Sequence, residues 1–220
     1  EHVGAQSEPG ILGLEAHLRS AQLEKLGLRY FFPCDGNTDI AARVETMLAG
    51  AFEELTVGDP GLIATDIGPV IDEAARAMLD EHAARMAHEG RMIAATPLPA
   101  GLEHGVFFAP RAFALDGIAR LTHEVFGPIL HVVRFAGDRL DQVVDAINGT
   151  GYGLTLGIHS RIDETVGAIL ERIHAGNVYV NRNMIGAVVG VQPFGGHGLS
   201  GTGPKAGGPL YLHRLVRGMS

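Results

Sequence analysis

The chain has 220 residues, of which 46% are hydrophobic and 19% charged, the balance of a soluble globular protein with one or two domains. Its net charge of −8 argues against a nucleic-acid partner and against an anionic membrane surface. No apolar run approaches the roughly 20 residues that span a bilayer, and the N-terminus lacks the basic start and apolar core of a signal peptide, so we expect a cytoplasmic protein.

The first half of the chain predicts three helices with short strands between them. Apolar residues recur at helical spacing in residues 11–28, 39–55 and 72–89. Asp39 can cap the second of these helices, and Gly90 suits the end of the third. Brief apolar runs predict strands at residues 28–32, 92–95 and 107–109.

The second half alternates strands with helices. Strands are predicted at residues 129–135, 154–159, 176–180 and 210–216, and helices at residues 140–147 and 164–173. Because this alternation is typical of sheets whose parallel strands are joined by helices, we expect an α/β fold with an open, largely parallel sheet.

The segment 181–208 is rich in glycine and carries only two charged residues, Arg182 and Lys205. Glycine costs conformational entropy on folding, so such a run predicts either positive-φ turns or the close approach of a ligand or another backbone. Apolar residues interrupt it, which favours an ordered loop that shapes a site over a disordered linker. Its glycines match neither the strand-to-helix context of a dinucleotide fingerprint nor a phosphate-binding loop, because Pro204 precedes Lys205 and no hydroxyl follows.

Few residues are good candidates for a nucleophile or a metal ligand. Cys34 is the chain's single cysteine, but it lies among turn residues beside Asp35, without a helix N-terminus or a cation to activate it. We therefore expect it to be structural or incidental. Ser200 lacks the spacing of a nucleophile elbow, and no histidine pair is joined to a suitable acid, so we expect no metal site.

Glu124 is displayed just before the predicted strand at 129–135, beside Phe126 and a Gly127-Pro128 turn. A carboxylate in that position could bind a pair of sugar hydroxyls. On pattern alone, a solvated loop carboxylate is the favoured interpretation.

Four motifs in one order resemble the aldehyde dehydrogenase superfamily. The motifs are Gly58-Asp59-Pro60 with Thr65 to Pro69, Glu124 to Pro128, Asn181, and Pro193 to Gly196 with Ser200-Gly201. The resemblance is closer still to one branch, the L-glutamate γ-semialdehyde (pyrroline-5-carboxylate) dehydrogenase half of bacterial proline utilisation A. Segments 151–157, 179–183 and 186–196 carry that likeness, which runs from about residue 39 to residue 216.

The resemblance implies an NAD-dependent oxidation of glutamate γ-semialdehyde to glutamate. Glu124 is expected to hold the nicotinamide ribose, with Phe126 packing near the nicotinamide. Asn181 is expected at the base of the substrate pocket, where it supports the site's loops. Gly186 and Ala187 are expected to present backbone N–H groups to the substrate's α-carboxylate, a role that suits bare backbone donors.

Two further expectations come from the same family. Phe194 would form part of the wall of the aldehyde channel. Residues 210–216, from Leu210 to Val216, would form a strand that reaches a partner subunit in a homo-oligomer.

The chain departs from the family at its N-terminal side. Aligning Leu28 and Arg29 with the family's strand puts Lys25 where the nucleophilic cysteine stands, and residues 1–27 resemble nothing in the family there. We expect no Rossmann cofactor domain in this chain. Three parts are therefore predicted: an atypical segment 1–38, a catalytic-domain-like α/β domain 39–208, and an oligomerisation strand 209–220.

Without a thiolate no covalent adduct with the aldehyde forms, so the isolated chain is expected to be inactive. Two alternatives stay open. The chain could be a dehydrogenase-derived module kept for binding or assembly, with 210–216 adding to a partner's sheet edge. It could also be a truncated gene product.

Overall fold

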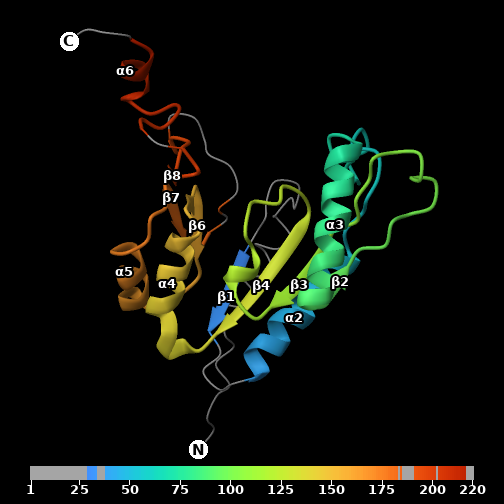
Figure 1. The fold of residues 1–220 in the computed structure, drawn as a ribbon, viewed down its shortest axis with the longest axis horizontal. Coiled ribbons are helices and arrows are strands. Elements are labelled where there is room, and N and C mark those ends of the chain that lie inside the picture. Colours follow the sequence, from blue (N-terminus) through green and yellow to red (C-terminus); the bar gives the residue numbers. More distant parts are fainter. Residues whose placement is uncertain (1–28, 34–37, 183, 185–190, 202, 217–220) are drawn as a thin grey trace, which may run out of the picture. The chain divides into compact units, whose positions relative to one another are not determined.

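The computed structural model describes residues 29–33, 38–182, 184, 191–201 and 203–216, which fall into two compact units (Figure 1). We call residues 29–140 the N-unit and residues 141–216 the C-unit. Each unit has its own strands and helices. The helix predicted at 11–28 lies outside the described residues.

The N-unit is built on a four-stranded sheet of order β1-β4-β3-β2. The strands β1 (Arg29–Pro33), β4 (Ile129–Phe135) and β3 (Arg111–Leu115) are parallel, and β2 (Arg91–Ala95) is antiparallel to β3. The α/β class is confirmed, and the sheet is mixed because one edge strand runs against the others.

The strand predicted at 107–109 is wrong, and β3 begins at Arg111 instead. Proline has no N–H for a strand ladder, so Pro110 marks the boundary of the paired segment. The Pro110 carbonyl still accepts from Thr96 N at 2.9 Å, and Arg111 N donates to Pro128 O at 3.1 Å. The apolar pattern of residues 107–109 instead reflects Phe108, which is 2% exposed in the core.

Two helices cover the sheet of the N-unit. The predicted helices at 39–55 and 72–89 are confirmed as α2 (Thr38–Glu53) and α3 (Glu73–Glu89). The Asp72 side chain accepts from Ala75 N at 2.7 Å and caps α3, and Gly90 ends it. A core cluster joins α3 to β3 and β4 through Leu79, Ala83, Met86, Phe113, Ile129 and Val133. Among the helices that the structure describes, none combines the length and apolar character needed to cross a bilayer.

A pair of histidines lies inside this core. His82 of α3 and His131 of β4 are 5% and 2% exposed, and their Nε2 atoms are 2.9 Å apart. Burial lowers the pKa of His82 to about 4, and the positive charges of Arg85 and His123 add to the effect. One neutral ring therefore donates to the other, and the pair ties the helix to the centre of the sheet.

The C-unit has shorter elements. The predicted helices at 140–147 and 164–173 are α4 (Leu140–Gly149) and α5 (Asp163–Leu170). The predicted strands at 154–159 and 176–180 are the parallel pair β6 (Thr155–Ile158) and β7 (Asn177–Val180). Two more strands that the sequence did not predict, β5 (Tyr152–Gly153) and β8 (His197–Gly198), form an antiparallel pair.

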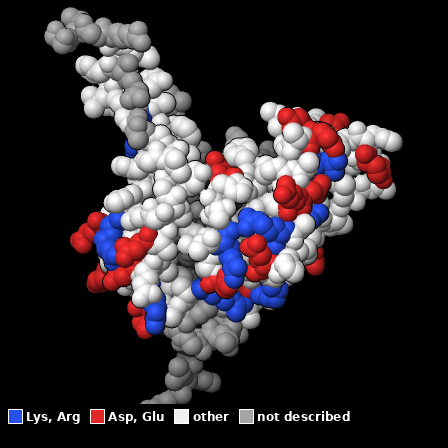
Figure 2. All heavy atoms as spheres, in the orientation of Figure 1, with Lys and Arg blue, Asp and Glu red and all other residues white. Residues whose placement is uncertain are grey.

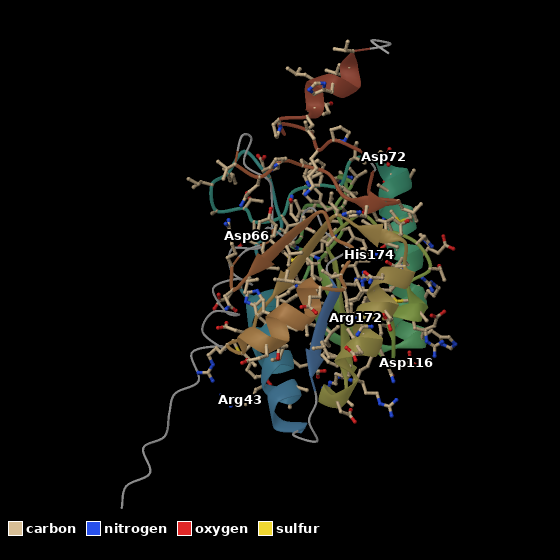
Figure 3. The ribbon with its side chains drawn as sticks, turned by 90° about the vertical axis from the view of Figure 1, so that its left-hand side faces the viewer. Arg43, Asp66, Asp72, Asp116, Arg172 and His174 are labelled. Carbon is tan, nitrogen blue, oxygen red and sulfur yellow. The ribbon has the colours of Figure 1, made fainter. Side chains whose placement is uncertain are left out.

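A side-chain amide connects α4 to the segment that follows α5. Asn148 Nδ2 donates to Arg172 O and Asn148 Oδ1 accepts from His174 N, both at 2.8 Å (Figure 3). The Arg172 guanidinium returns to α4 and contacts the carboxylates of Asp141 and Asp145. One asparagine therefore satisfies two backbone groups that no strand or helix pairs.

The strand predicted at 210–216 is wrong, because the structure forms α6 (Tyr211–Leu215) there. A strand needs a neighbour for its N–H and C=O groups, and no described strand pairs with this segment. A helix satisfies those groups locally. Its apolar side chains are exposed, at 61% for Leu210, 71% for Leu212 and 65% for Leu215.

The depressed pKa of His82 predicts acid sensitivity of the N-unit. Well above pH 6.5 the imidazole is neutral whether the chain is folded or unfolded, so it adds no pH dependence there. As the pH falls from 6.5 towards 4, the unfolded chain takes up a proton that the buried ring resists. The free energy of unfolding therefore falls by up to about 1.4 kcal/mol per pH unit in this window.

His82→Gln removes this titration, so its unfolding free energy, measured by urea denaturation between pH 7 and pH 4.5, should fall less steeply than that of the wild type. His88→Gln, on the exposed part of the same helix, serves as the control. Equal slopes for His82→Gln and the wild type would contradict the buried neutral pair.

Candidate functional site

The turn 124–128 presents two side chains outward and anchors itself with a third. Val125 is 5% exposed and belongs to the core cluster, whereas Glu124 is exposed and Phe126 is 59% exposed. A Cβ at Gly127 would lie 2.5 Å from Leu79 Cδ2, so only glycine lets the turn close over this fully buried leucine. Ile129 N donates to Gly127 O at 2.8 Å and starts β4.

This arrangement suits recognition of a ribose beside an aromatic ring. An exposed carboxylate such as that of Glu124 can accept hydrogen bonds from two neighbouring hydroxyls. An exposed ring such as that of Phe126 can pack on a flat heterocycle. Both side chains leave one short, core-anchored turn, so their backbone positions are fixed before a ligand arrives.

The motif at 58–69 serves to close a loop in the N-unit. Asp66 Oδ2 accepts from Thr56 N at 2.9 Å, and Ile67 makes a parallel bridge with Val57 (Figure 3). Asp59 Oδ1 accepts from Gly61 N at 2.8 Å at the loop's tip. Both aspartates of this motif thus accept hydrogen bonds from backbone N–H groups of the loop itself.

Asn181 binds the loop that leaves β6. Its Nδ2 donates to Ser160 O at 2.8 Å, and its Oδ1 accepts from Ser160 N at 3.0 Å. Its φ of 53° is the one positive value among the described non-glycine residues, a conformation that asparagine tolerates better than most. Asn181 therefore holds the loop at Ser160 in place.

The glycine-rich segment packs its backbone directly on the strands of the C-unit. A Cβ at Gly176 would fall well inside van der Waals distance of Gly195 O, and one at Gly196 would do the same with Gly153 O. Gly198 has a φ of 57°, so one turn also needs positive φ. The segment thus contains both features that the sequence predicted for its glycines, a positive-φ turn and a close approach. The group that approaches is another backbone.

Phe194 projects from this segment on a fixed backbone. Phe194 N donates to Ala206 O at 2.9 Å, and Ala206 N donates to Phe194 O at 2.7 Å. Its side chain is 52% exposed. An exposed ring whose backbone is held by two hydrogen bonds can form the wall of a channel.

The other expected site residues, Gly186 and Ala187, lie outside the described residues. Cys34, which we expect to be structural or incidental, and Lys25, which aligns with the family's cysteine, lie outside them too. Glu124 and Phe126 share one turn of the N-unit, and Asn181 and Phe194 belong to the C-unit. The structure therefore brings Glu124 and Phe126 together on one turn, whereas Asn181 and Phe194 bind different partners, Ser160 and Ala206.

Sequence reasoning missed two polar residues that organise the C-unit, Asn177 and Lys205. The Lys205 ammonium donates to Gly176 O and to Asn177 Oδ1, the latter at 3.1 Å, and Asn177 Nδ2 donates to Pro193 O at 3.1 Å. The available signal was a lone lysine in a stretch almost without charge.

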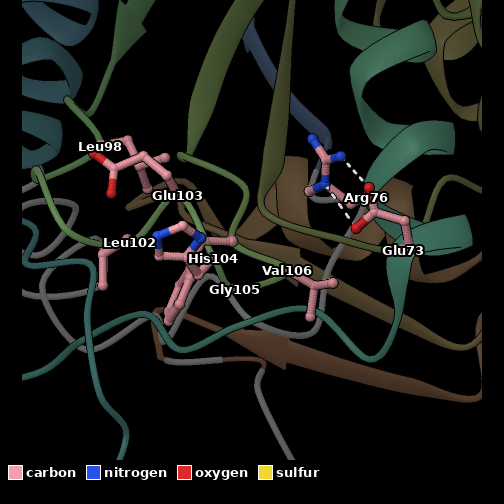
Figure 4. Close-up of a pocket in the computed structure, with 9 residues that line it drawn as sticks. Glu73, Arg76, Leu98, Leu102, Glu103, His104, Gly105 and Val106 are labelled. Atoms are coloured by element: carbon pink, nitrogen blue, oxygen red, sulfur yellow. Dashed lines mark hydrogen bonds and ion pairs between the residues drawn. The ribbon is translucent and has the colours of Figure 1, made fainter.

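A polar pocket of about 260 Å³ lies at the start of α3 (Figure 4). Two of its charged lining residues, Arg76 and Glu73, form an ion pair with each other, and Arg76 also contacts the carboxylate of Asp80. Leu98, Glu103 and His104 complete much of the wall. None of the expected site residues that the structure describes lines it. No group of three potential metal ligands occurs in the part of the chain that the structure describes.

Charge is spread unevenly over the surface. On the face drawn in Figure 2, charged side chains of both signs gather over α3 and over α4 and α5. Few lie over the glycine-rich segment and α6. The exposed apolar side chains of the C-unit concentrate there, with Val191 at 73% and Leu199 at 69% exposure.

Residues 37–218 match the aldehyde dehydrogenase family. The bifunctional protein PutA of Escherichia coli (strain K12) is 52% identical over 183 residues, which are 81% of this chain and 14% of PutA. The 1-pyrroline-5-carboxylate dehydrogenase of Geobacillus thermodenitrificans (strain NG80-2) is 40% identical over 177 residues, or 79% of this chain and 33% of that enzyme.

Solved structures resemble the chain over most of its length. A mutant of Bradyrhizobium japonicum proline utilization A has a TM-score of 0.84 and 51% identity, covering 92% of this chain and 21% of that one. The Thermus 1-pyrroline-5-carboxylate dehydrogenase with bound NAD has a TM-score of 0.76 and 30% identity, covering 92% of this chain and 38% of that one. The chain thus spans between a seventh and two fifths of the length of these relatives.

The close backbone approach predicts that Gly176 cannot be replaced. Gly176→Ala places a methyl group against Gly195 O and should lower the free energy of unfolding by about 2 kcal/mol or more. Urea denaturation followed by circular dichroism measures this change.

Gly167→Ala is the matched control, because a Cβ at this helical position in α5 meets nothing within 4 Å. It should stabilise the chain by about 0.5–1 kcal/mol through helix propensity. Equal effects of the two substitutions would contradict the packing described for Gly176.

Proposed function

The chain belongs to the aldehyde dehydrogenase family, and we propose that it is part of an NAD-dependent dehydrogenase that oxidises L-glutamate γ-semialdehyde to glutamate. The observation that carries this proposal is the 52% sequence identity to PutA over 81% of this chain. The match to the family, over residues 37–218, includes both the turn 124–128 and the glycine-rich segment. The relatives' names refer to proline utilisation and to pyrroline-5-carboxylate, the cyclic form of the semialdehyde.

The turn 124–128 fits the cofactor. We assign the ribose hydroxyls to the Glu124 carboxylate and the nicotinamide neighbourhood to Phe126. Their exposure and the core anchoring of Val125 support this assignment. NAD supplies the hydride acceptor when it is bound.

The C-unit would hold the substrate. Gly186 and Ala187 would offer backbone N–H groups to the α-carboxylate, because amide donors without bulky side chains admit an anion closely. Phe194 would face the aliphatic part of the substrate, which its 52% exposure supports. Asn181 would act at one remove, by holding the loop at Ser160.

The 220 residues alone should not turn over substrate. Oxidation in this family begins when a cysteine thiolate adds to the aldehyde carbon. Lys25 occupies the aligned position, and the single cysteine is Cys34, on the other side of the strand β1. This polypeptide should therefore bind the substrate without oxidising it.

The substrate assignment predicts that the chain binds L-glutamate, the product of the proposed reaction. Saturation-transfer NMR should show glutamate contacts, and 4-aminobutanoate, which lacks only the α-carboxylate, should give a signal several-fold weaker. Ala187→Pro removes one backbone donor and should weaken the glutamate signal by a similar factor.

An activity assay serves as the companion measurement. Addition of NAD and pyrroline-5-carboxylate to the chain should produce no NADH above the enzyme-free rate. Robust NADH formation that disappears in Cys34→Ala would identify Cys34 as the nucleophile and overturn the alignment. Equal binding of glutamate and 4-aminobutanoate would count against the carboxylate site.

We also propose that the chain forms homo-oligomers through α6. The support is the exposure of Leu210, Leu212 and Leu215 on a segment with few charges.

Light scattering tests this association. The wild type should show a mass above that of the monomer at high protein concentration, and Leu212→Ser with Leu215→Ser should return it to the monomer. A wild-type chain that stays monomeric throughout would rule out this interface.

A further inference from the structure

Three contacts attach the glycine-rich segment to the start of β7. Asn177 Nδ2 donates to Pro193 O at 3.1 Å. The backbones of Gly176 and Gly195 approach so closely that neither a methyl group nor a water fits between them. The third contact is made by the Lys205 side chain, which reaches back to β7 across 28 residues of sequence.

The Lys205 ammonium lies at the centre of this attachment. It donates to Gly176 O and to Asn177 Oδ1, so the Asn177 amide accepts from Lys205 while it donates to Pro193. Lys205 also precedes Ala206, whose backbone pairs with Phe194 in both directions. The contacts therefore close a ring that contains the backbone of Phe194.

A lysine suits this position better than an arginine. The chain has 17 basic residues, and only Lys25 and Lys205 are lysines. A compact ammonium group can direct its three N–H donors at oxygens on different sides, whereas a guanidinium is planar and larger. The Lys205 stem also covers Gly195, since a Cβ built there would lie 3.2 Å from Lys205 Cγ.

Lys205 is not used as a surface ion-pair partner. Among the ion pairs of the described residues, none includes it, and its hydrogen-bond acceptors are two neutral oxygens. Because its acceptors are neutral, the half-buried Lys205 ammonium neutralises no carboxylate. Its directional hydrogen bonds order the backbone and the side chain that accept them.

We infer that Lys205 is the positioning residue of the proposed substrate loop: acting through Asn177, it fixes the backbone of Phe194 and thereby sets the wall of the channel. The inference rests on the proposed function for the identity of the ligand. The mechanical part, the link from Lys205 to Phe194, rests on the contacts alone.

The absence of tryptophan from the sequence allows a direct test. In the full 220-residue chain, Phe194→Trp introduces a single fluorophore at the position in question. Adding Lys205→Met, which keeps the stem and removes the donors, should at least double the acrylamide quenching constant of this tryptophan. It should also accelerate hydrogen exchange at the Ala206 amide about tenfold.

Two further variants make the test specific. Arg161→Met removes an exposed cation from the same unit and should leave quenching unchanged. Asn177→Ala should reproduce the effect of Lys205→Met, and combining the two should add nothing, because both interrupt one chain of contacts. Asn177→Ala also keeps the test valid if Lys205→Met does not fold.

Unchanged quenching in both Lys205→Met and Asn177→Ala, or additive effects in the double variant, would overturn the inference. These readouts need no substrate, so they are independent of the dehydrogenase proposal. If glutamate fails to alter the fluorescence of Phe194→Trp but Lys205→Met still raises quenching, the substrate assignment fails and the positioning role stands.

Discussion

The C-unit depends on backbones that pack without side chains between them. Gly153 lies against His174 O, Gly176 against Gly195 O, and Gly198 against Gly151 O, each at a separation that a Cβ would not permit. The last two approaches place the glycine-rich segment directly on the residues that precede β7 and β5. Because so little apolar surface is buried there, hydrogen bonds to backbone groups must supply the order that a side-chain core supplies elsewhere.

Amide side chains provide many of those hydrogen bonds. Asn148, Asn177 and Asn181 each bind backbone groups of a neighbouring loop. Each can donate and accept at once, so one residue can satisfy two backbone groups that have no strand partner. The N-unit uses the opposite solution, in which α3 and the sheet bury a continuous apolar cluster and the polar pair His82–His131 is paired internally.

The sequence predicted the elements whose periodicity is local. The strand at 129–135 and the helix capped by Asp72 were found with nearly correct bounds, because their apolar spacing and end residues lie within one segment. The predictions failed at 107–109 and 210–216, where the outcome depends on whether a partner strand is available. Apolar residues next to Pro110 entered the core as a loop, and the unpaired segment near the C-terminus became α6.

The candidate site shows the same difference between features that depend on local sequence and features that depend on distant partners. The outward placement of Glu124 and Phe126 could be anticipated, since a buried Val125 between them fixes the alternation. The role of Lys205 could not, because its acceptors lie far away in sequence. Close backbone packing also explains glycine at positions such as 176 and 196 without any ligand. Among the described residues, a substrate-binding role must therefore be argued from groups that this packing leaves free, such as the exposed ring of Phe194. Intolerance of substitution at Gly176 is no evidence for such a role.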